Sequence, residues 1–225
     1  MKSQNNIFSC LDKQLAIALN QLKLLYDNRN HDRCKTLSGR YIKICENYIN
    51  LDNIDSESKN YLRVISLFFR GFIDYIDLMK IMNSIDIHSD IEHKKIENMW
   101  DILCDIKINI PYIKIIKHPL VKFIIEETSE INKWFLDYFG PGLYFSTVIL
   151  CDYKCNICNN NIDDCEHRPG TIYNGTICQK VGYNIKDILS VDIVENPADP
   201  KCRIWPWNIN DDGTYSARIM TLNSN

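Results

Sequence analysis

The chain lacks several features that would assign it to a class at once. No run of about 18 apolar residues occurs, so we expect no transmembrane helix. The first residues, Met-Lys-Ser-Gln-Asn-Asn, lack the apolar segment of a secretion signal, and we therefore expect a cytoplasmic protein. Neither sign of charge dominates, since the net charge is −3, which argues against a nucleic acid or an anionic membrane as the main partner.

Cysteine is abundant, with ten residues in a chain of 225. Because no export signal is present, these residues are better explained as thiols and metal ligands than as disulfides. Four of them fall within helical patterns and are predicted to be small buried core residues: Cys10, Cys34, Cys45 and Cys104.

The first part of the chain shows apolar residues at helical spacing. Asp55 or Ser56 is expected to cap the third helix, Ser89 or Asp90 the fourth, and Pro119 to start the fifth. Short polar joints between the segments favour an antiparallel bundle or a stack of helical hairpins, although no fixed repeat period is found. The segments with this spacing are residues 11–22, 41–48, 61–79, 96–104 and 119–138.

The pattern changes after Gly140-Pro141-Gly142, which ends the helical part sharply. Short apolar runs at 143–150 and 189–194 predict strands, and Asn174-Gly175 predicts a tight turn. A terminal hairpin is expected within 203–222. The sequence therefore predicts an α+β protein, with an all-α domain at 1–142 and a small zinc-stabilised β-rich domain at 143–225.

Four cysteine and histidine residues that can bind a metal lie close together at the start of the second part. Cys155 and Cys158 form a Cys-x-x-Cys step, and Cys165 and His167 form a Cys-x-His pair. One tight turn lets two thiolates reach one ion, and the second pair completes a tetrahedron of three sulfurs and one nitrogen, which suits zinc. Such a closed set predicts a structural Zn²⁺ site. Cys178 is the substitute ligand if His167 does not bind, and we favour His167.

A catalytic or nucleic-acid role for this cluster is disfavoured. A catalytic zinc keeps a position open for water, and the zinc deaminases place His-x-Glu before their Cys-x-x-Cys, which is absent before Cys155. Asp163, Asp164 and Glu166 surround the ligands, so phosphate would be repelled. Carboxylates such as Asp101 could still serve a nuclease-like enzyme, and the lysines of 114–122 a nucleic-acid-binding adaptor.

Two stretches resemble known protein families. The spacing from Cys155 to Cys178, with Gly170, Tyr173 and Gly175, resembles a zinc module of prokaryotic and mobile-element proteins. Residues 191–200 resemble the strand and turn of phage prohead maturation proteases. That resemblance implies a similar small β fold, with Asp192 where the family usually has serine. It does not imply proteolysis, because the catalytic histidine and serine of the family have no identifiable counterparts in this chain.

The leading hypothesis is a non-enzymatic interaction or adaptor protein, in which a helical domain docks a protein partner beside a zinc-stabilised β module. The resemblance implies an accessory subunit of a prophage or anti-phage system. Trp205-Pro206-Trp207 is a candidate interface anchor, since tryptophan is enriched at binding hot spots, although the sequence favours packing of these rings over the zinc module. The oligomeric state stays open.

Overall fold

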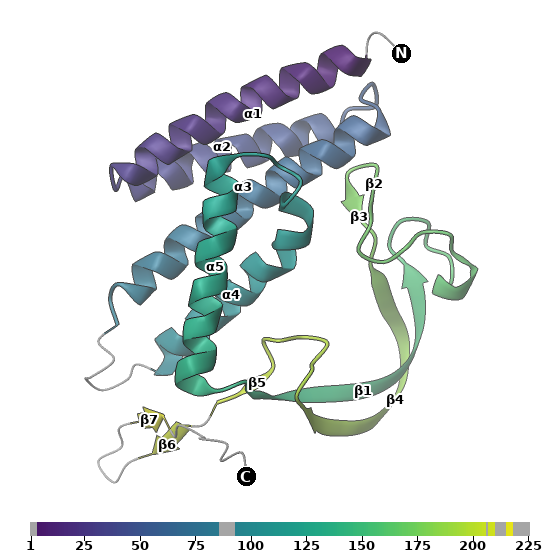
Figure 1. Cartoon of the computed structure of the whole chain (residues 1–225). Coiled ribbons are helices and arrows are strands. Elements are labelled where there is room, and N and C mark those ends of the chain that lie inside the picture. Colours follow the sequence, from purple (N-terminus) through teal and green to yellow (C-terminus); the bar gives the residue numbers. More distant parts are fainter. Residues whose placement is uncertain (1–3, 86–92, 206, 210–214, 218–225) are drawn as a thin grey trace.

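Helices come first along the chain and small antiparallel sheets follow, so the predicted α+β class is confirmed (Figure 1). The structure, a computed structural model, describes residues 4–85, 93–205, 207–209 and 215–217. No helix within these residues has the length and apolar character needed to cross a membrane. The helices are α1 (Gln4–Asp27), α2 (His31–Ile49), α3 (Ser56–Met82), α4 (His93–Ile113) and α5 (Pro119–Phe139).

Helix α3 forms the centre of the helical half. Asp55 caps it as predicted, because its Oδ1 accepts a hydrogen bond from the Ser58 N–H at 2.9 Å. Phe68, Phe72 and Tyr75 on α3 are fully buried, as the broad apolar face predicts. Because α3 contacts α2, α4 and α5 while α1 contacts α5, the helices form a bundle closed around α3 rather than an open stack of hairpins.

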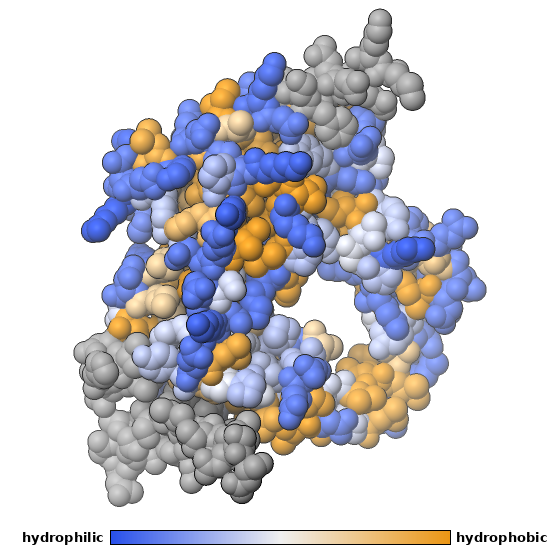
Figure 2. Space-filling model, viewed as in Figure 1, coloured by the Kyte–Doolittle hydropathy of each residue, from blue (hydrophilic) through white to orange (hydrophobic). Residues whose placement is uncertain are grey.

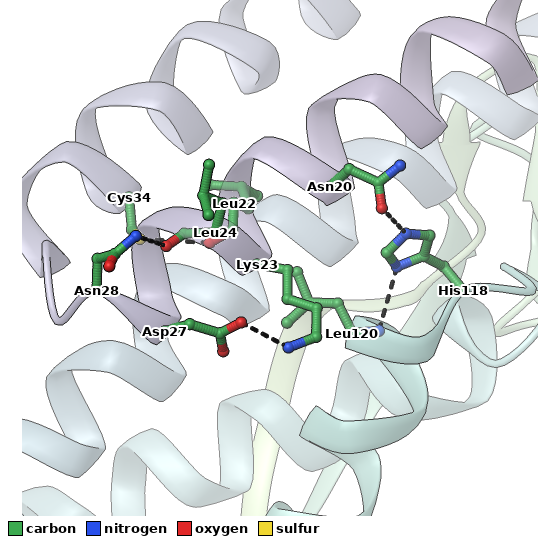
Figure 3. A network of polar contacts seen from close by, with 9 residues as sticks. All are labelled: Asn20, Leu22, Lys23, Leu24, Asp27, Asn28, Cys34, His118 and Leu120. Atoms are coloured by element: carbon green, nitrogen blue, oxygen red, sulfur yellow. Dashed lines mark hydrogen bonds and ion pairs between the residues drawn. The ribbon is translucent and has the colours of Figure 1, made fainter.

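The other helix ends follow from local sequence. Pro119 begins α5 as predicted, and His118 caps this helix by accepting the Leu120 N–H at Nδ1 (3.1 Å). The other ring nitrogen of His118 lies 3.2 Å from Asn20 Oδ1, so this histidine links α5 to α1 (Figure 3). The caps predicted at 89 and 90 lie outside the described residues.

Three of the helical cysteines are buried as predicted. Cys34, Cys45 and Cys104 are at most 3% exposed, and the Cys34 thiol donates to the Leu22 carbonyl (Figure 3). Burial raises their pKa values to about 11, 12 and 11, so these thiols stay protonated and unreactive. The Cys10 side chain lies outside the described residues.

A long two-stranded ribbon dominates the second half. Its strands, β1 and β4, pair antiparallel over most of their length, and both extend well beyond the strands predicted at 143–150 and 189–194. Register shifts at Val148/Ile149 and Leu150/Asp152 break the alternation that would have revealed the full length. The elements are β1 (Leu143–Cys155), η1 (Ile162–Asp164), β2 (Ile172–Tyr173), β3 (Thr176–Ile177), β4 (Lys180–Val194), β5 (Arg203–Ile204), β6 (Trp207–Ile209) and β7 (Tyr215–Ala217). Strands β6 and β7 pair as the predicted terminal hairpin.

The near end of the ribbon is fixed to the bundle by Arg203, which is 5% exposed. Its Nη2 donates to the carbonyls of Phe139 (2.9 Å) and Gly140 (2.7 Å), where α5 ends and its dipole favours a cation. The guanidinium also lies 4.7 Å from the centre of the Trp100 ring. Gly142, at φ 87°, is required here because a Cβ would come within 2.7 Å of Arg203 Nη1.

The far end of the ribbon returns to the bundle through the β2–β3 hairpin. Asn174 and Gly175 have φ values of 50° and 77°, which confirms the predicted tight turn. The Gly175 N–H donates to Asn60 Oδ1 (2.8 Å), and the Gly175 carbonyl accepts from Arg63 Nε (2.6 Å). A Cβ at Gly175 would come within 2.7 Å of Ile49, so the contact is tight.

The ribbon contacts the bundle at both ends and curves away from it in between. Figure 2 shows an opening through the molecule between the helices, the ribbon and the β2–β3 hairpin. The chain changes from helix to strand between Phe139 and Leu143, near the predicted boundary at 142. The division into two domains stays a prediction, because both ends of the ribbon pack on the helical core.

Asp74 on α3 provides a test of the packing between α3 and α4. Burial first, and then the nearby carboxylates of Asp105 and Asp77, raise the pKa of Asp74 from 3.8 to about 6. The folded state thus binds this proton more tightly than the unfolded chain, and stability is lost as the pH rises from about 4 to about 6. We expect Asp74→Asn to raise the melting temperature at neutral pH and to change it little at about pH 4.

Thermal unfolding of wild type and variant across this pH range measures the effect. Asp77→Asn is the control, because Asp77 accepts from Lys35 at 2.7 Å and its neutralisation removes an ion pair. The same gain at acidic and neutral pH would contradict the assignment to Asp74 ionisation.

Candidate metal centre

Strand β1 delivers the first two cysteines of the cluster. Cys155 is the last residue of β1, and the chain turns back at once, with the Asn159 N–H donating to the Cys155 carbonyl (2.9 Å). Asn159 has φ 63°, a left-handed conformation that asparagine tolerates. The Ile157 N–H points at Cys155 Sγ (3.3 Å). The turn therefore presents the Cys155 and Cys158 thiols on one side and supplies an N–H donor to a thiolate.

The second pair follows the short helix η1. Asn161 caps η1 by accepting the Asp163 N–H at 3.1 Å, and the chain leaves this turn at Cys165. The His167 N–H then donates to Cys165 Sγ (3.3 Å), which repeats the arrangement seen at Cys155. The His167 ring packs edge-on against Tyr173, 4.6 Å away. These contacts orient the imidazole toward the thiols.

The four predicted ligand atoms converge. The sulfurs of Cys158 and Cys165 lie 3.4 Å apart, and His167 Nδ1 lies 3.4 Å from Cys165 Sγ and 3.8 Å from Cys155 Sγ. All four lie within 4.8 Å of one another. In a tetrahedron with Zn–S bonds of about 2.3 Å, neighbouring ligand atoms are about 3.8 Å apart. The spacing and donor types fit zinc, and the ion itself stays a prediction.

Cys178 remains close enough to compete for the fourth position. Its Sγ lies 3.7 Å from Cys155 Sγ, and its side chain is 1% exposed. It stands outside the set of four whose ligand atoms mutually lie within 4.8 Å. This geometry favours His167 as the fourth ligand, with Cys178 as a buried neighbour of the site.

The electrostatics of the cluster favour a cation. Burial raises the pKa of a thiol here, yet N–H donors at Cys158 and Ile157 and the neighbouring thiols lower the pKa of Cys155 to about 6. Burial, together with the thiols of Cys158 and Cys155, raises the pKa of Cys165 to about 11. A thiolate at Cys155 thus opposes ionisation of the neighbouring Cys165 thiol, and a cation between them would relieve this repulsion. Three thiolates on one Zn²⁺ leave a negative site, which disfavours phosphate.

The structure describes the side chain of one of the two tryptophans that were predicted to form an interface anchor. The Trp205 ring packs edge-on against Trp100 (6.3 Å) and Phe139 (5.6 Å), on the bundle and not over the metal cluster. The helical core therefore holds Trp205. The side chain of Trp207 lies outside the described residues, and an interface anchor formed by these two residues stays a prediction.

The carboxylates considered for a nuclease-like role do not converge at metal-ligand distance among the described residues, whereas Lys114, Lys117 and Lys122 line one hollow together with Glu126. Asp105 pairs with Lys201 at 2.6 Å, and Glu126 lies 3.5 Å from Lys122 on the same helix. Among the residues that the structure describes, the Cys155 cluster is the one place where three or more metal-ligand side chains converge. The described part of the chain thus supports a metal centre and shows no second ligand set.

Sequence reasoning missed an exposed apolar surface on the ribbon. Residues paired across an antiparallel ladder share a face, and β1 pairs Phe145 with Ile193 and Ile149 with Ile188. We call this the outer face; its members are Phe145, Thr147, Ile149, Ile188, Val191 and Ile193. The five apolar members are 38–62% exposed, and apolar side chains gather over β1 and β4 in Figure 2. The alternation Val191-Asp192-Ile193 predicts a strand. Only the structure shows that no described residue covers the outer face of that strand.

A second apolar surface lies on the bundle. A groove of about 1050 Å³ runs between α1 and α2 with α3 as its floor. Tyr41 forms part of its wall and stacks on Phe69 at 4.9 Å, while Arg40 lies at the groove as its charged group.

Comparison with known proteins yields no relative: no family model matches the chain, and neither the curated proteins nor the solved structures contain a match. The resemblances of residues 155–178 and 191–200 therefore rest on the quoted residues alone. What the structure adds is the convergence of the four Cys and His side chains.

Loss of one ligand tests whether the cluster folds the far end of the ribbon. We expect Cys158→Ser to abolish zinc binding and to unfold the segment between β1 and β4, because the free energy of metal binding is part of its folding free energy. The helical signal in circular dichroism should be largely retained. Elemental analysis and circular dichroism measure the two effects, with Cys202→Ser as control because Cys202 is exposed and lies outside the cluster. Equal loss of zinc and helix would show one merged folding unit.

The fourth ligand can be identified by comparing two substitutions. We expect His167→Ala to weaken zinc affinity by at least about 100-fold, more than the cost of losing an outer-shell contact. Cys178→Ser should stay within about tenfold of wild type. Competition with a zinc-binding dye measures both. The reverse order would make Cys178 the ligand.

Proposed function

We propose that this protein is a non-enzymatic, zinc-stabilised interaction protein that binds another polypeptide on the outer face of its ribbon. The exposure of that face carries the proposal: Val191 and Ile193 are 61% and 62% exposed, and Phe145 is 51% exposed. The five apolar members leave roughly 400–500 Å² of apolar surface in water, a patch size that is often functional on a monomer.

The metal centre supports this proposal by its structural character. Cys155, Cys158, Cys165 and His167 would hold the ion with no ligand position left for water, so zinc would supply stability rather than chemistry. The metal centre lies at the far end of the ribbon. The β2–β3 hairpin beside it contacts α3 through Asn60 and Arg63. The zinc module would thereby keep the outer face extended and presented.

The competing functions have weaker support. A nuclease-like enzyme needs carboxylates that converge on a metal ion, and among the described residues the group of three or more ligand atoms at metal-binding distance contains no carboxylate. A nucleic-acid adaptor needs a broad basic surface, whereas Lys114, Lys117 and Lys122 form a small hollow that they share with Glu126. An accessory role in a prophage or anti-phage system is the biological setting that the resemblance of residues 150–205 suggests.

Site-specific crosslinking in the native cells tests the proposal. A photo-crosslinking amino acid at Val191 should give a covalent adduct of discrete mass with another polypeptide. The matched control places it at Val148, which is exposed but lies on the opposite face of the ribbon. Mass spectrometry identifies the adduct. Absence of an adduct from Val191, or equal adducts from both positions, would refute binding at the outer face.

A further inference from the structure

The outer face is directed away from the bundle. Successive residues of a strand point to opposite sides, so Tyr144 and its partner Val194 share the other face. Tyr144 is 5% exposed and belongs to the helical core, and Val194 packs against it. Phe145 and Ile193, one residue along, must therefore project outward from the near end of the ribbon. A second body can approach this face without meeting the helices there.

The composition of the outer face limits what can cover it. Five of its six members are apolar, the sixth is Thr147, and none is charged. A partner of matching chemistry is an uncharged apolar surface of similar length and twist. The same face on another copy of the chain has these properties, and an isologous contact makes one patch complementary to itself.

The β4 edge of the ribbon is less suited to association than the outer face. Strand β4 lies at the edge of the described sheet, but register shifts interrupt it beside Leu189 and around Asn184. Lys180 and Lys186 lie along this edge strand, and bulges and lysines are features that discourage edge pairing. Association through the outer face leaves these features in solvent.

The area of the face agrees with a weak but specific contact. Two copies packed face to face would bury roughly 900 Å² from the five apolar side chains of each. The exposed Thr147 of each copy brings the total to about the ~1,000 Å² that a specific interface needs.

We propose that the polypeptide bound at the outer face is a second copy of this chain. The two ribbons pack outer face to outer face about a two-fold axis and form a small two-layer sandwich, with the two bundles on the outside. This inference rests on the proposed function and names its partner. The chain is then a zinc-stabilised homodimer at micromolar concentration.

Native mass spectrometry and sedimentation of the zinc-loaded full-length protein, from about 1 to 100 µM, test the inference. We expect a concentration-dependent dimer. Val191→Asp should raise the dimer Kd at least about 100-fold, because two-fold symmetry buries the unpaired carboxylate twice. Val148→Asp, the same substitution on the opposite face, should change the Kd less than about threefold. Circular dichroism and zinc content verify that both variants fold, and Ile193→Ser gives a milder change on the outer face.

A wild-type protein that is monomeric at 100 µM would overturn the inference. A dimer insensitive to both Val191→Asp and Ile193→Ser, or equally sensitive to Val148→Asp, would do the same. These outcomes differ from failure of the proposed function. A Val191 crosslink to a different protein keeps the interaction function and removes the homodimer, whereas a crosslink to this chain's own sequence supports both.

Discussion

Closure of the far end of the ribbon by the Cys and His cluster is the constraint on which the second half of the structure depends. A two-stranded ribbon is at best marginally stable in water on its own. Cys155 ends β1, and the other ligands follow before β4 begins, so a single ion would compact the whole connection. Only a compact connection brings Gly175 to its hydrogen bonds with Asn60 and Arg63.

The near end of the ribbon uses a different interaction. Arg203 is buried without an ion pair to any described carboxylate, an arrangement that would be costly for an isolated charge. The α5 carbonyls of Phe139 and Gly140 and the aromatic rings of Trp100 and Trp205 surround it instead. Burial lowers the pKa of this guanidinium, which nevertheless stays charged. One cation thus joins the end of α5 to the sheet.

These two anchors explain why an apolar face stays exposed. The bundle covers only the end of the inner face, at Tyr144 and Val194, and the ribbon bows away beyond them. The inner face carries the polar Ser146 and Asp192 beside the exposed Val148, whereas the outer face carries Phe145 and Ile193. The more apolar of the two faces is therefore the one turned away from the bundle, the reverse of the usual arrangement for a sheet that covers its own core. This inversion is the physical basis for an interaction function.

The sequence by itself determined the local features. Helical spacing, the cap at Asp55, the helix start at Pro119, the Asn174-Gly175 turn and the Cys155–His167 spacing each depend on neighbouring residues. The structure contains the elements that they predict. Tertiary structure decided the rest. The register shifts of the ribbon, the burial of Arg203, the placement of Trp205 on the bundle and the exposure of the outer face all arise from contacts between distant segments. Alternation along a strand shows that two faces differ, but only packing decides which face meets the core.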